Sequence, residues 1–239
     1  MSNYVIVIPA LNPTESLIDY VKALLAKGAR HVLVVNDGSD REFDSIFSEI
    51  SLIEKCTVLR HHKNKGKGRA LKTAFAYFLG HFQEMDGVIT ADADGQHSVE
   101  DVFKVANAIS SDENEIVLGV RDFQKTHVPG RSQLGNKITS FLFRFLFHYK
   151  LEDTQTGLRG IPASQLSWML QLKGERYEFE INMLIHARLR DIDFRKVPIQ
   201  TLYFNRNEGS HYHPLFDSLK IFSQLVRGYF YDASLWRKK

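Results

Sequence analysis

The sequence predicts an α/β protein with one open, mostly parallel central sheet and helices on both of its faces. In the first half of the chain, five short runs rich in Val and Ile alternate with helical segments. These runs are apolar almost throughout, which is typical of strands covered on both faces. With 239 residues, of which 44% are hydrophobic, the chain is long enough to bury such a core.

The predicted strands of this half are residues 4–8, 31–35, 57–60, 87–91 and 115–120. The first predicted helix has the clearest signals: Asn12 as N-cap, Pro13 at the first helical position, Glu15 three residues after the cap, and Gly28 after its end. The other helices of this half are predicted at residues 43–50, 68–82 and 99–109.

The second half is less regular. Pro129 and Gly130 predict a loop, and an aromatic-rich helix is expected over residues 132–149. A polar turn and strand over 153–160, two helices, a strand over 194–202 and a helical stretch from Pro214 follow. Because we find no repeat and no linker, we expect a single domain over residues 1–239.

The composition excludes several classes of protein. The net charge of +3 is small and the basic residues are dispersed, so we expect no nucleic-acid partner. The one cysteine, Cys56, excludes an internal disulfide and is expected in a buried strand. We see no signal peptide, and no run reaches the ~18 apolar residues that span a bilayer. The expectation is a cytoplasmic protein that spans no membrane.

Three polar clusters follow predicted strands, at residues 9–12, 36–40 and 92–97. In open α/β sheets, ligands bind beyond the carboxyl ends of the strands. A single cluster of this kind is equally well explained as a capped turn, because Asn, Asp, Ser and Gly favour turns for local reasons. For residues 37–40 both interpretations stay open.

Asp92 and Asp94 are harder to explain as a turn. Two carboxylates two residues apart at a strand end can converge on one hard cation, and Mg²⁺ or Mn²⁺ suits oxygen ligands. Gln96 could add a neutral oxygen. We expect His97 to support this site through a hydrogen bond rather than to bind the ion.

The segment 64–71, NKGKGRAL, resembles a phosphate loop that leads into a helix. It lacks the spacing of a Walker A motif, and no GxGxxG occurs in the chain. Both facts count against nucleoside-triphosphate hydrolysis and dinucleotide chemistry. Taken alone, the segment is explained by a glycine-bounded helix start with solvated lysines.

In the order VIPALNP, VVNDGSD, NKGKGRAL, ADADGQH and DTQTGLRG, these motifs resemble those of family 2 glycosyltransferases, and among them the polyprenyl-phosphate sugar transferases. The resemblance implies the GT-A fold, a Rossmann-like, mostly parallel central sheet flanked by helices. It also implies one catalytic domain in which residues 1–97 bind the nucleotide sugar and residues 98–239 form the acceptor side.

The resemblance further implies roles for single residues. The donor-binding residues would be Pro9, Ala10, Asn12, Asp37, Lys67, Asp92, Ala93, Asp94 and Glu178, with Glu180 as the alternative to Glu178, and the metal ligands would be Asp92, Asp94 and Gln96. The catalytic set would be Arg121 and Arg131 on the acceptor phosphate, Asp153 near the reacting centre, and Arg206 in a loop that closes over the diphosphate. For Asp153, Glu178 and residues 204–211, the alternatives are a turn residue, a helix N-terminal acid and a surface loop.

The implied reaction is an inverting, Mg²⁺- or Mn²⁺-dependent transfer from a nucleotide-diphosphate sugar to a polyprenyl phosphate, with a UDP-sugar favoured over GDP-mannose. Such an acceptor places the protein at the inner face of the membrane. Contact would come through the helix bearing Phe141, Phe143, Phe145 and Phe147, through residues 215–236, or through a membrane-protein partner. A homo-oligomer is a further expectation.

Two alternatives stay open. One is a soluble family 2 transferase acting on a hydroxyl of a glycan, teichoic acid or protein, with Asp153 as general base. The other is a non-catalytic nucleotide-sugar-binding protein.

Overall fold

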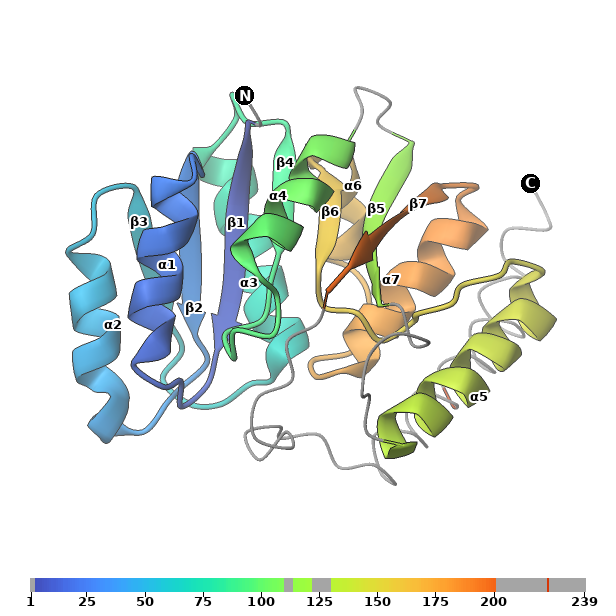
Figure 1. Ribbon diagram of the computed structural model, residues 1–239, viewed down its shortest axis with the longest axis horizontal. Coiled ribbons are helices and arrows are strands. Elements are labelled where there is room, and N and C mark those ends of the chain that lie inside the picture. Colours follow the sequence, from blue (N-terminus) through green and yellow to red (C-terminus); the bar gives the residue numbers. More distant parts are fainter. Residues whose placement is uncertain (1–2, 110–113, 122–129, 201–222, 224–239) are drawn as a thin grey trace.

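The computed structural model describes residues 3–109, 114–121, 130–200 and 223, and its centre is a seven-stranded sheet (Figure 1). The strands are β1 (Tyr4–Ala10), β2 (His31–Asn36), β3 (Cys56–Arg60), β4 (Gly87–Thr90), β5 (Glu115–Arg121), β6 (Arg159–Pro162) and β7 (Asp193–Ile199). Their order across the sheet is β3-β2-β1-β4-β6-β5-β7. The predicted α/β class is confirmed.

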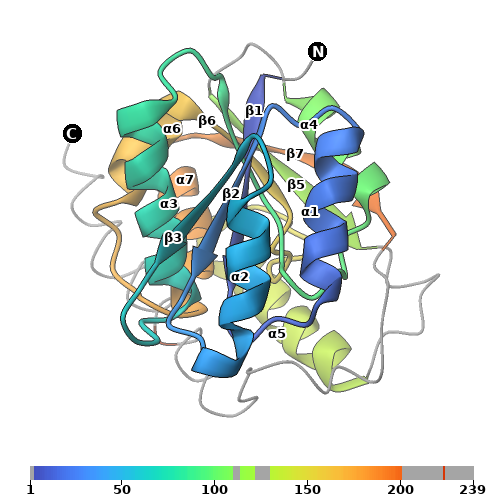
Figure 2. The same cartoon turned by 90° about the vertical axis from the view of Figure 1, so that its left-hand side faces the viewer.

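Helices cover both faces of the sheet. They are α1 (Ser16–Ala26), the short 3₁₀ helix η1 (Arg41–Phe43), α2 (Asp44–Ser51), α3 (Lys67–His81), α4 (Val99–Ala108), α5 (Gly130–Phe147), α6 (Ala163–Met169) and α7 (Glu178–Leu189). Figure 2 shows α1 and α4 on one side of the sheet and α3, α6 and α7 on the other, while α5 lies below it. No helix in the part of the chain that the structure describes is long and apolar enough to cross a bilayer.

The core consists of two layers because both faces of the strands are covered. In β1, Val5 and Val7 pack with α3, whereas Ile6 and Ile8 pack with the helices of the opposite face. All four side chains are buried. The continuous apolar runs of the sequence therefore have the predicted cause.

Strand polarity decides where the loops meet. β1, β2, β3 and β4 pair in parallel, and so do β5 and β7, whereas β6 runs antiparallel between β4 and β5. The carboxyl ends of β1, β2 and β4 therefore share one edge of the sheet. Because β6 is reversed, the loop that precedes it approaches the same edge, with Arg159 opposite Thr90.

The predicted start of the first helix is wrong. α1 begins at Ser16, its N-cap position is Glu15, and no side chain caps it. Asn12 instead adopts a positive φ of 48°, a conformation that Asn tolerates better than most residues. Its side chain is engaged across the loop by Asp40, so a tertiary contact outweighs the local capping signal.

Other boundaries differ less. The strand expected over residues 153–160 begins only at Arg159, because Asp153 and Thr154 are tied into a loop by side-chain hydrogen bonds. Cys56 does open a strand, where it is half-buried, and burial raises the pKa of its thiol to about 11. Residues 201–222, including the predicted helix start at Pro214, lie outside the described part of the chain.

Candidate functional site

The three polar clusters predicted from the sequence meet at the carboxyl edge of β1, β2 and β4. β1 lies between β2 and β4, so the residues that follow these strands are neighbours. The loop before β6 joins them, because the Thr90 hydroxyl at the end of β4 donates a 2.7 Å hydrogen bond to the Gly157 carbonyl. Four segments that are far apart in the sequence thus form one candidate site.

The first two clusters are tied to each other. The Asn12 side-chain amide donates to Asp40 Oδ2 at 3.0 Å, and the Asp40 backbone N–H donates back to Asn12 Oδ1 at 3.0 Å. The Asn12 backbone N–H also donates to Ser39 Oγ. Beside them, Pro9 and the buried Ala10 are the last residues of β1. The predicted contacts of Pro9, Ala10 and Asn12 with a donor stay predictions.

Asp37 is used inside the protein. Its buried carboxylate accepts hydrogen bonds from the backbone N–H groups of Gly66 (2.7 Å) and Lys65 (3.0 Å). It also pairs at 2.6 Å with Nδ1 of the buried His61, whose Nε2 lies 2.9 Å from Thr73 Oγ1. Asp37 therefore holds the glycine loop in place. No local pattern singles out His61, because its partners come from other segments of the chain.

The glycines of this loop allow close packing. Gly66 has a φ of 100°, and an added Cβ would lie 2.4 Å from the Glu175 carbonyl oxygen. A Cβ on Gly68 would lie 2.5 Å from the Cβ of Phe179. The start of α3 thus packs directly on the chain that enters α7, and Lys67 is held between the two glycines.

Lys67 lies between two carboxylates. Its Nζ is 2.7 Å from Asp92 Oδ1 and 3.1 Å from Glu180 Oε1. His97 Nε2 is 3.2 Å from the other oxygen of Asp92, as the predicted supporting hydrogen bond requires. Each carboxylate oxygen of Asp92 therefore has a partner, and the partner of Oδ1, the Lys67 ammonium, is a cation.

The two carboxylates of the DAD motif have opposite pKa shifts. Burial alone would raise the pKa of Asp92, but Lys67 and His97 outweigh it and hold this pKa well below its ordinary range. The pKa of Asp94 is raised, first by desolvation and then by the charge of Asp92, although its side chain keeps contact with solvent. The Gln96 backbone N–H donates to Asp94 at 3.0 Å. Asp94 therefore carries an incompletely compensated charge.

Gly157 leaves the room that Asp92 needs. A Cβ at this position would lie 2.5 Å from Asp92 Oδ2 and 2.7 Å from Oδ1. Gly157 is the glycine of the motif DTQTG, and it was not among the predicted site residues; its place after a polar turn is the signal that could have indicated it. Gly157 belongs to the site because no other residue could stand against this carboxylate.

The residues present fit a divalent cation whose coordination is completed by a bound phosphate group and water. Asp92 and Asp94 supply hard oxygen ligands whose mutual repulsion a cation would relieve. Within the described ranges, however, no three His, Cys, Asp or Glu side chains converge as a complete metal site. An ion here would take its remaining ligands from phosphate oxygens and water.

A second ion pair joins Arg121, the last residue of β5, to Asp153 in the loop before β6. Arg121 Nε donates to Asp153 Oδ2 at 2.6 Å, and its Nη2 donates to Oδ1 at 2.9 Å. The backbone N–H of Gln155 donates to Asp153 at 3.1 Å. The structure thus brings together two of the four predicted catalytic residues, but it pairs them with each other.

Two further charged groups lie close to the site. Arg159 is fully buried, and it donates to the carbonyl oxygens of Thr156 (3.0 Å) and Glu180 (2.8 Å). Glu178, which is predicted to bind the nucleotide-sugar donor, accepts a hydrogen bond from the Glu175 backbone N–H at 3.2 Å. Of the two acids of α7 it is Glu180, and not Glu178, that pairs with Lys67.

Two predicted catalytic residues cannot be compared with the structure. Arg131 is in the first turn of α5, but its side chain lies outside what the structure describes. Arg206 lies in the undescribed residues 201–222, as does the whole loop 204–211. Their roles stay predictions.

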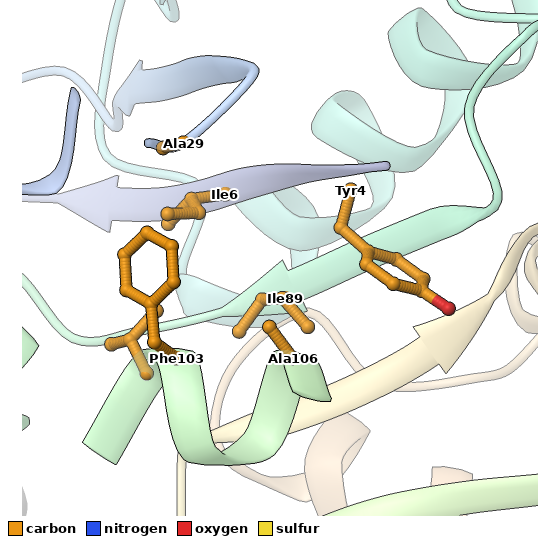
Figure 3. Close-up of a pocket in the computed structure, with 7 residues that line it drawn as sticks. Tyr4, Ile6, Ala29, Ile89, Phe103 and Ala106 are labelled. Atoms are coloured by element: carbon orange, nitrogen blue, oxygen red, sulfur yellow. The ribbon is translucent and has the colours of Figure 1, made fainter. Parts of the chain in front are cut away.

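A small apolar pocket lies away from this site, between the sheet and α4 (Figure 3). Apolar side chains of β1, β4 and α4 line it, among them Ile6, Ile89 and Phe103. Ile6 and Ile89 face each other in the middle of their strands, not at the carboxyl edge. Because its lining has no charged side chain, the pocket offers nothing to a phosphate.

The chain is similar in sequence to proteins of one known family. Residues 5–167 match the family described as Glycosyl transferase family 2. The UDP-N-acetylglucosamine–dolichyl-phosphate N-acetylglucosaminyltransferase of Methanococcus voltae is 32% identical over 219 residues, which are 83% of this chain and 85% of the relative. The dolichyl-phosphate beta-glucosyltransferase of Saccharomyces cerevisiae is 26% identical over 249 residues, which are 92% of this chain and 72% of the relative.

Solved structures show the same fold. Glucosyl-3-phosphoglycerate synthase of Mycobacterium tuberculosis, in complex with Mn²⁺, UDP and phosphoglyceric acid, superposes with a TM-score of 0.67 and 18% identity. The alignment covers 96% of this chain and 79% of that one. The predicted GT-A type of α/β fold is thereby confirmed.

Proposed function

The chain belongs to glycosyl transferase family 2 and is a glycosyltransferase, and from this premise we propose that it transfers a sugar from a nucleotide-diphosphate sugar to a polyprenyl phosphate, with inversion at the anomeric carbon. A UDP-sugar is the proposed donor. The name of the M. voltae relative supports this choice, since it specifies a UDP-sugar and a dolichyl-phosphate acceptor.

The donor side of the site supports the first part of the proposal. The glycine loop, ordered by Asp37, leads into the N-terminus of α3, where a helix favours negative charge. Lys67 is the first residue of this helix and adds a full positive charge. Loop, helix terminus and lysine together suit the diphosphate of a nucleotide sugar.

Asp92 and Asp94 would hold a Mg²⁺ or Mn²⁺ ion, whose contribution is to neutralise the charge that develops on the leaving nucleoside diphosphate. Lys67 contributes a positive charge to the same group. Gly157 lets the loop before β6 pack against the Asp92 carboxylate without displacing it. The residues of the chain thus position and neutralise the leaving group, and the acceptor supplies the nucleophile.

The Arg121–Asp153 pair is the observation that carries the choice of acceptor. The Asp153 carboxylate accepts two hydrogen bonds from a guanidinium and a third from the Gln155 N–H. Both oxygens of this carboxylate are thus engaged by donors of the protein itself, whereas a general base needs an oxygen within hydrogen-bond reach of the acceptor hydroxyl. A phosphate acceptor is anionic already and requires no base, so it fits a site in which Asp153 serves to orient Arg121.

We also propose that the protein reaches its lipid acceptor from the membrane surface. Phe141 and Phe145, one turn apart on α5, are each 68% exposed, and Arg144 between them is exposed as well. Aromatic and basic side chains on one helix suit the interface of a bilayer. The cytoplasmic location, a membrane-protein partner and a homo-oligomer stay predictions.

A transfer assay tests the acceptor and the donor. The protein is incubated with Mn²⁺, with UDP-N-acetylglucosamine, UDP-glucose or GDP-mannose in turn, and with vesicles that contain polyprenyl phosphate. We expect labelled sugar in the organic phase with a UDP-sugar, and none with Asp94→Ala or with a chelator. Transfer only to a water-soluble hydroxyl acceptor would overturn the proposed acceptor, and full activity in chelator would overturn the metal assignment.

A flotation experiment tests the membrane contact. The double variant Phe141→Ser/Phe145→Ser should lose binding to anionic vesicles and keep its free energy of unfolding, because both side chains are exposed. Leu52→Ser is the matched control, since Leu52 is an 86% exposed apolar residue that follows α2. Equal loss of binding in the control would contradict the role of α5.

A further inference from the structure

The Lys67 ammonium lies between two carboxylates of the candidate site, one of which is a proposed metal ligand. This group bridges Asp92 and Glu180, at 2.7 and 3.1 Å. The second oxygen of Asp92 is held by His97 at 3.2 Å. In this arrangement a carboxylate expected to bind a divalent ion is already neutralised by a side chain of the protein itself.

We propose that Lys67 is a built-in counter-cation that exchanges with the divalent ion: it pairs with Asp92 while the donor site is empty, and it moves to the donor's diphosphate when the ion takes its place. This inference rests on the proposed function, because it requires that an ion and a nucleotide diphosphate bind here.

The position of Lys67 allows such an exchange. It is the first residue of α3, so its ammonium needs to turn only from the two carboxylates toward the anion that the helix terminus favours. A lysine carries its charge on a flexible four-carbon chain and has no fixed hydrogen-bonding plane. Its side chain is 19% exposed and Asp92 is 27% exposed, so the pair is open to an incoming ligand.

The charges explain why the exchange would be needed. Asp92, Asp94 and Glu180 bring three negative charges to a small region, and Lys67 compensates one of them. A divalent ion on Asp92 would meet the like charge of the ammonium at close range. The ion and Lys67 therefore compete for Asp92, and a diphosphate that attracts Lys67 removes the competitor. Donor and ion then strengthen each other's binding, as linkage requires.

A permanent structural ion pair predicts the opposite. If Lys67 stayed on Asp92 throughout, its removal would leave a poorly supported carboxylate and would not improve ion binding. The two views differ in the affinity for the ion alone, without any donor, so the test does not depend on turnover.

The test measures Mn²⁺ binding by electron paramagnetic resonance, with and without UDP. Without UDP, Lys67→Met should bind Mn²⁺ about tenfold more tightly than the wild type, within the range of ~5–150-fold that is typical of coupled sites. Without UDP, Lys67→Arg should bind Mn²⁺ no more tightly than the wild type, because it keeps the competing charge. UDP should strengthen Mn²⁺ binding more in the wild type than in Lys67→Met.

Lys65→Met is the matched control, because it removes the same charge from an exposed residue of the same loop. In the described part of the chain, the backbone N–H of Lys65, and not its ammonium, contacts Asp37. It should leave the Mn²⁺ affinity unchanged. Circular dichroism checks the fold, and Lys67→Gln replaces Lys67→Met if the latter does not fold.

Two results would contradict the exchange, and they have different consequences for the proposed function. Unchanged or weaker Mn²⁺ binding in a folded Lys67→Met or Lys67→Gln protein, with UDP-dependent binding intact in the wild type, overturns the exchange and leaves the proposed function standing. If the wild type binds no Mn²⁺ even with UDP, the proposed metal-dependent function fails, and the exchange fails with it.

Discussion

The two ion pairs of the site differ in how firmly they are held. Arg121 and Asp153 meet through two parallel hydrogen bonds, with Asp153 fully buried and Arg121 14% exposed. Lys67 contacts Asp92 through one carboxylate oxygen and also pairs with Glu180. Unlike Asp153, both Lys67 and Asp92 are partly exposed, at 19% and 27%. A guanidinium fork fits a carboxylate in one geometry, whereas an ammonium is a point charge with many.

The difference indicates that the two ion pairs have different roles. The bidentate pair is suited to fix a surface against which an acceptor is placed, because neither partner can leave without exposing a buried charge. The monodentate pair is suited to open when a ligand offers better partners. Four substitutions test this contrast, and they follow in order of the size of the expected effect.

Asp153→Asn should have the largest effect. It removes the charge of the fully buried Asp153 carboxylate from its pair with Arg121, and breaking a buried ion pair typically costs ~3–5 kcal/mol in the free energy of unfolding. Urea unfolding followed by circular dichroism measures this. Glu152→Gln is the control: it removes a neighbouring carboxylate that pairs with Lys150 at the surface, for which ~0–1 kcal/mol is expected. Equal effects of the two substitutions would show that burial does not distinguish the pairs.

Gly157→Ala should impair activity more than stability. The added methyl group would lie 2.5 Å from Asp92 Oδ2 and force this carboxylate to move. A displacement of ~1 Å at a reacting site can lower the rate ~100-fold, so we expect a loss of that order in kcat/KM. Gly80→Ala in α3, which would contact nothing within 4 Å, should keep full activity and gain ~0.5–1 kcal/mol in stability. Undiminished turnover in Gly157→Ala would show that the Asp92 carboxylate does not depend on a glycine at this position.

Acid should weaken the Lys67–Asp92 pair. The pKa of Asp92 is lowered in the folded protein, so the pair contributes stability above the ordinary carboxyl pKa of ~3.9, and this contribution is lost as the pH falls further. At pH 7, Asp92→Asn should therefore cost ~1.5–3 kcal/mol, as expected for a hydrogen bond to a charged group. The difference from the wild type should shrink toward pH 2–3 in urea unfolding. A difference that is constant with pH would contradict the ion pair.

Asp94→Asn should have the smallest effect on stability, and of opposite sign. Because the pKa of Asp94 is raised in the folded protein, its ionised form is disfavoured by folding, and its charge lowers stability above the ordinary carboxyl pKa. In the absence of donor and metal, the variant should be more stable at pH 7 by ~0.5 kcal/mol or less, since the group is solvent-exposed. The gain should vanish at pH 3, while sugar transfer is lost. A loss of stability at pH 7 would contradict the assignment.

Much of the fold could be predicted because its signals are local. A strand covered on both faces must be apolar throughout, and helices between such strands are amphipathic, so the sequence itself carries the order of the elements. The boundaries failed where a side chain had a distant partner. Asn12 has the residue type of an N-cap, but its amide binds Asp40, and α1 begins four residues later.

The candidate site could be predicted only in part, for the same reason. The strand ends located Asp37, Asp92 and Asp94, because parallel strands bring their carboxyl ends to one edge. Nothing local indicated that β6 would run antiparallel and place Gly157 against Asp92, or that His61 would support Asp37.

The sequence by itself determined which chemical groups follow the parallel strands at the edge of the sheet, since the order of the elements along the chain and the positions of the motifs follow from local patterns. Only the tertiary structure decided how they pair: Lys67 with Asp92 and Glu180, and Arg121 with Asp153 across 32 residues of chain. The physical reason is that a charge selects its partner by distance and burial, and both are set by how the whole chain packs.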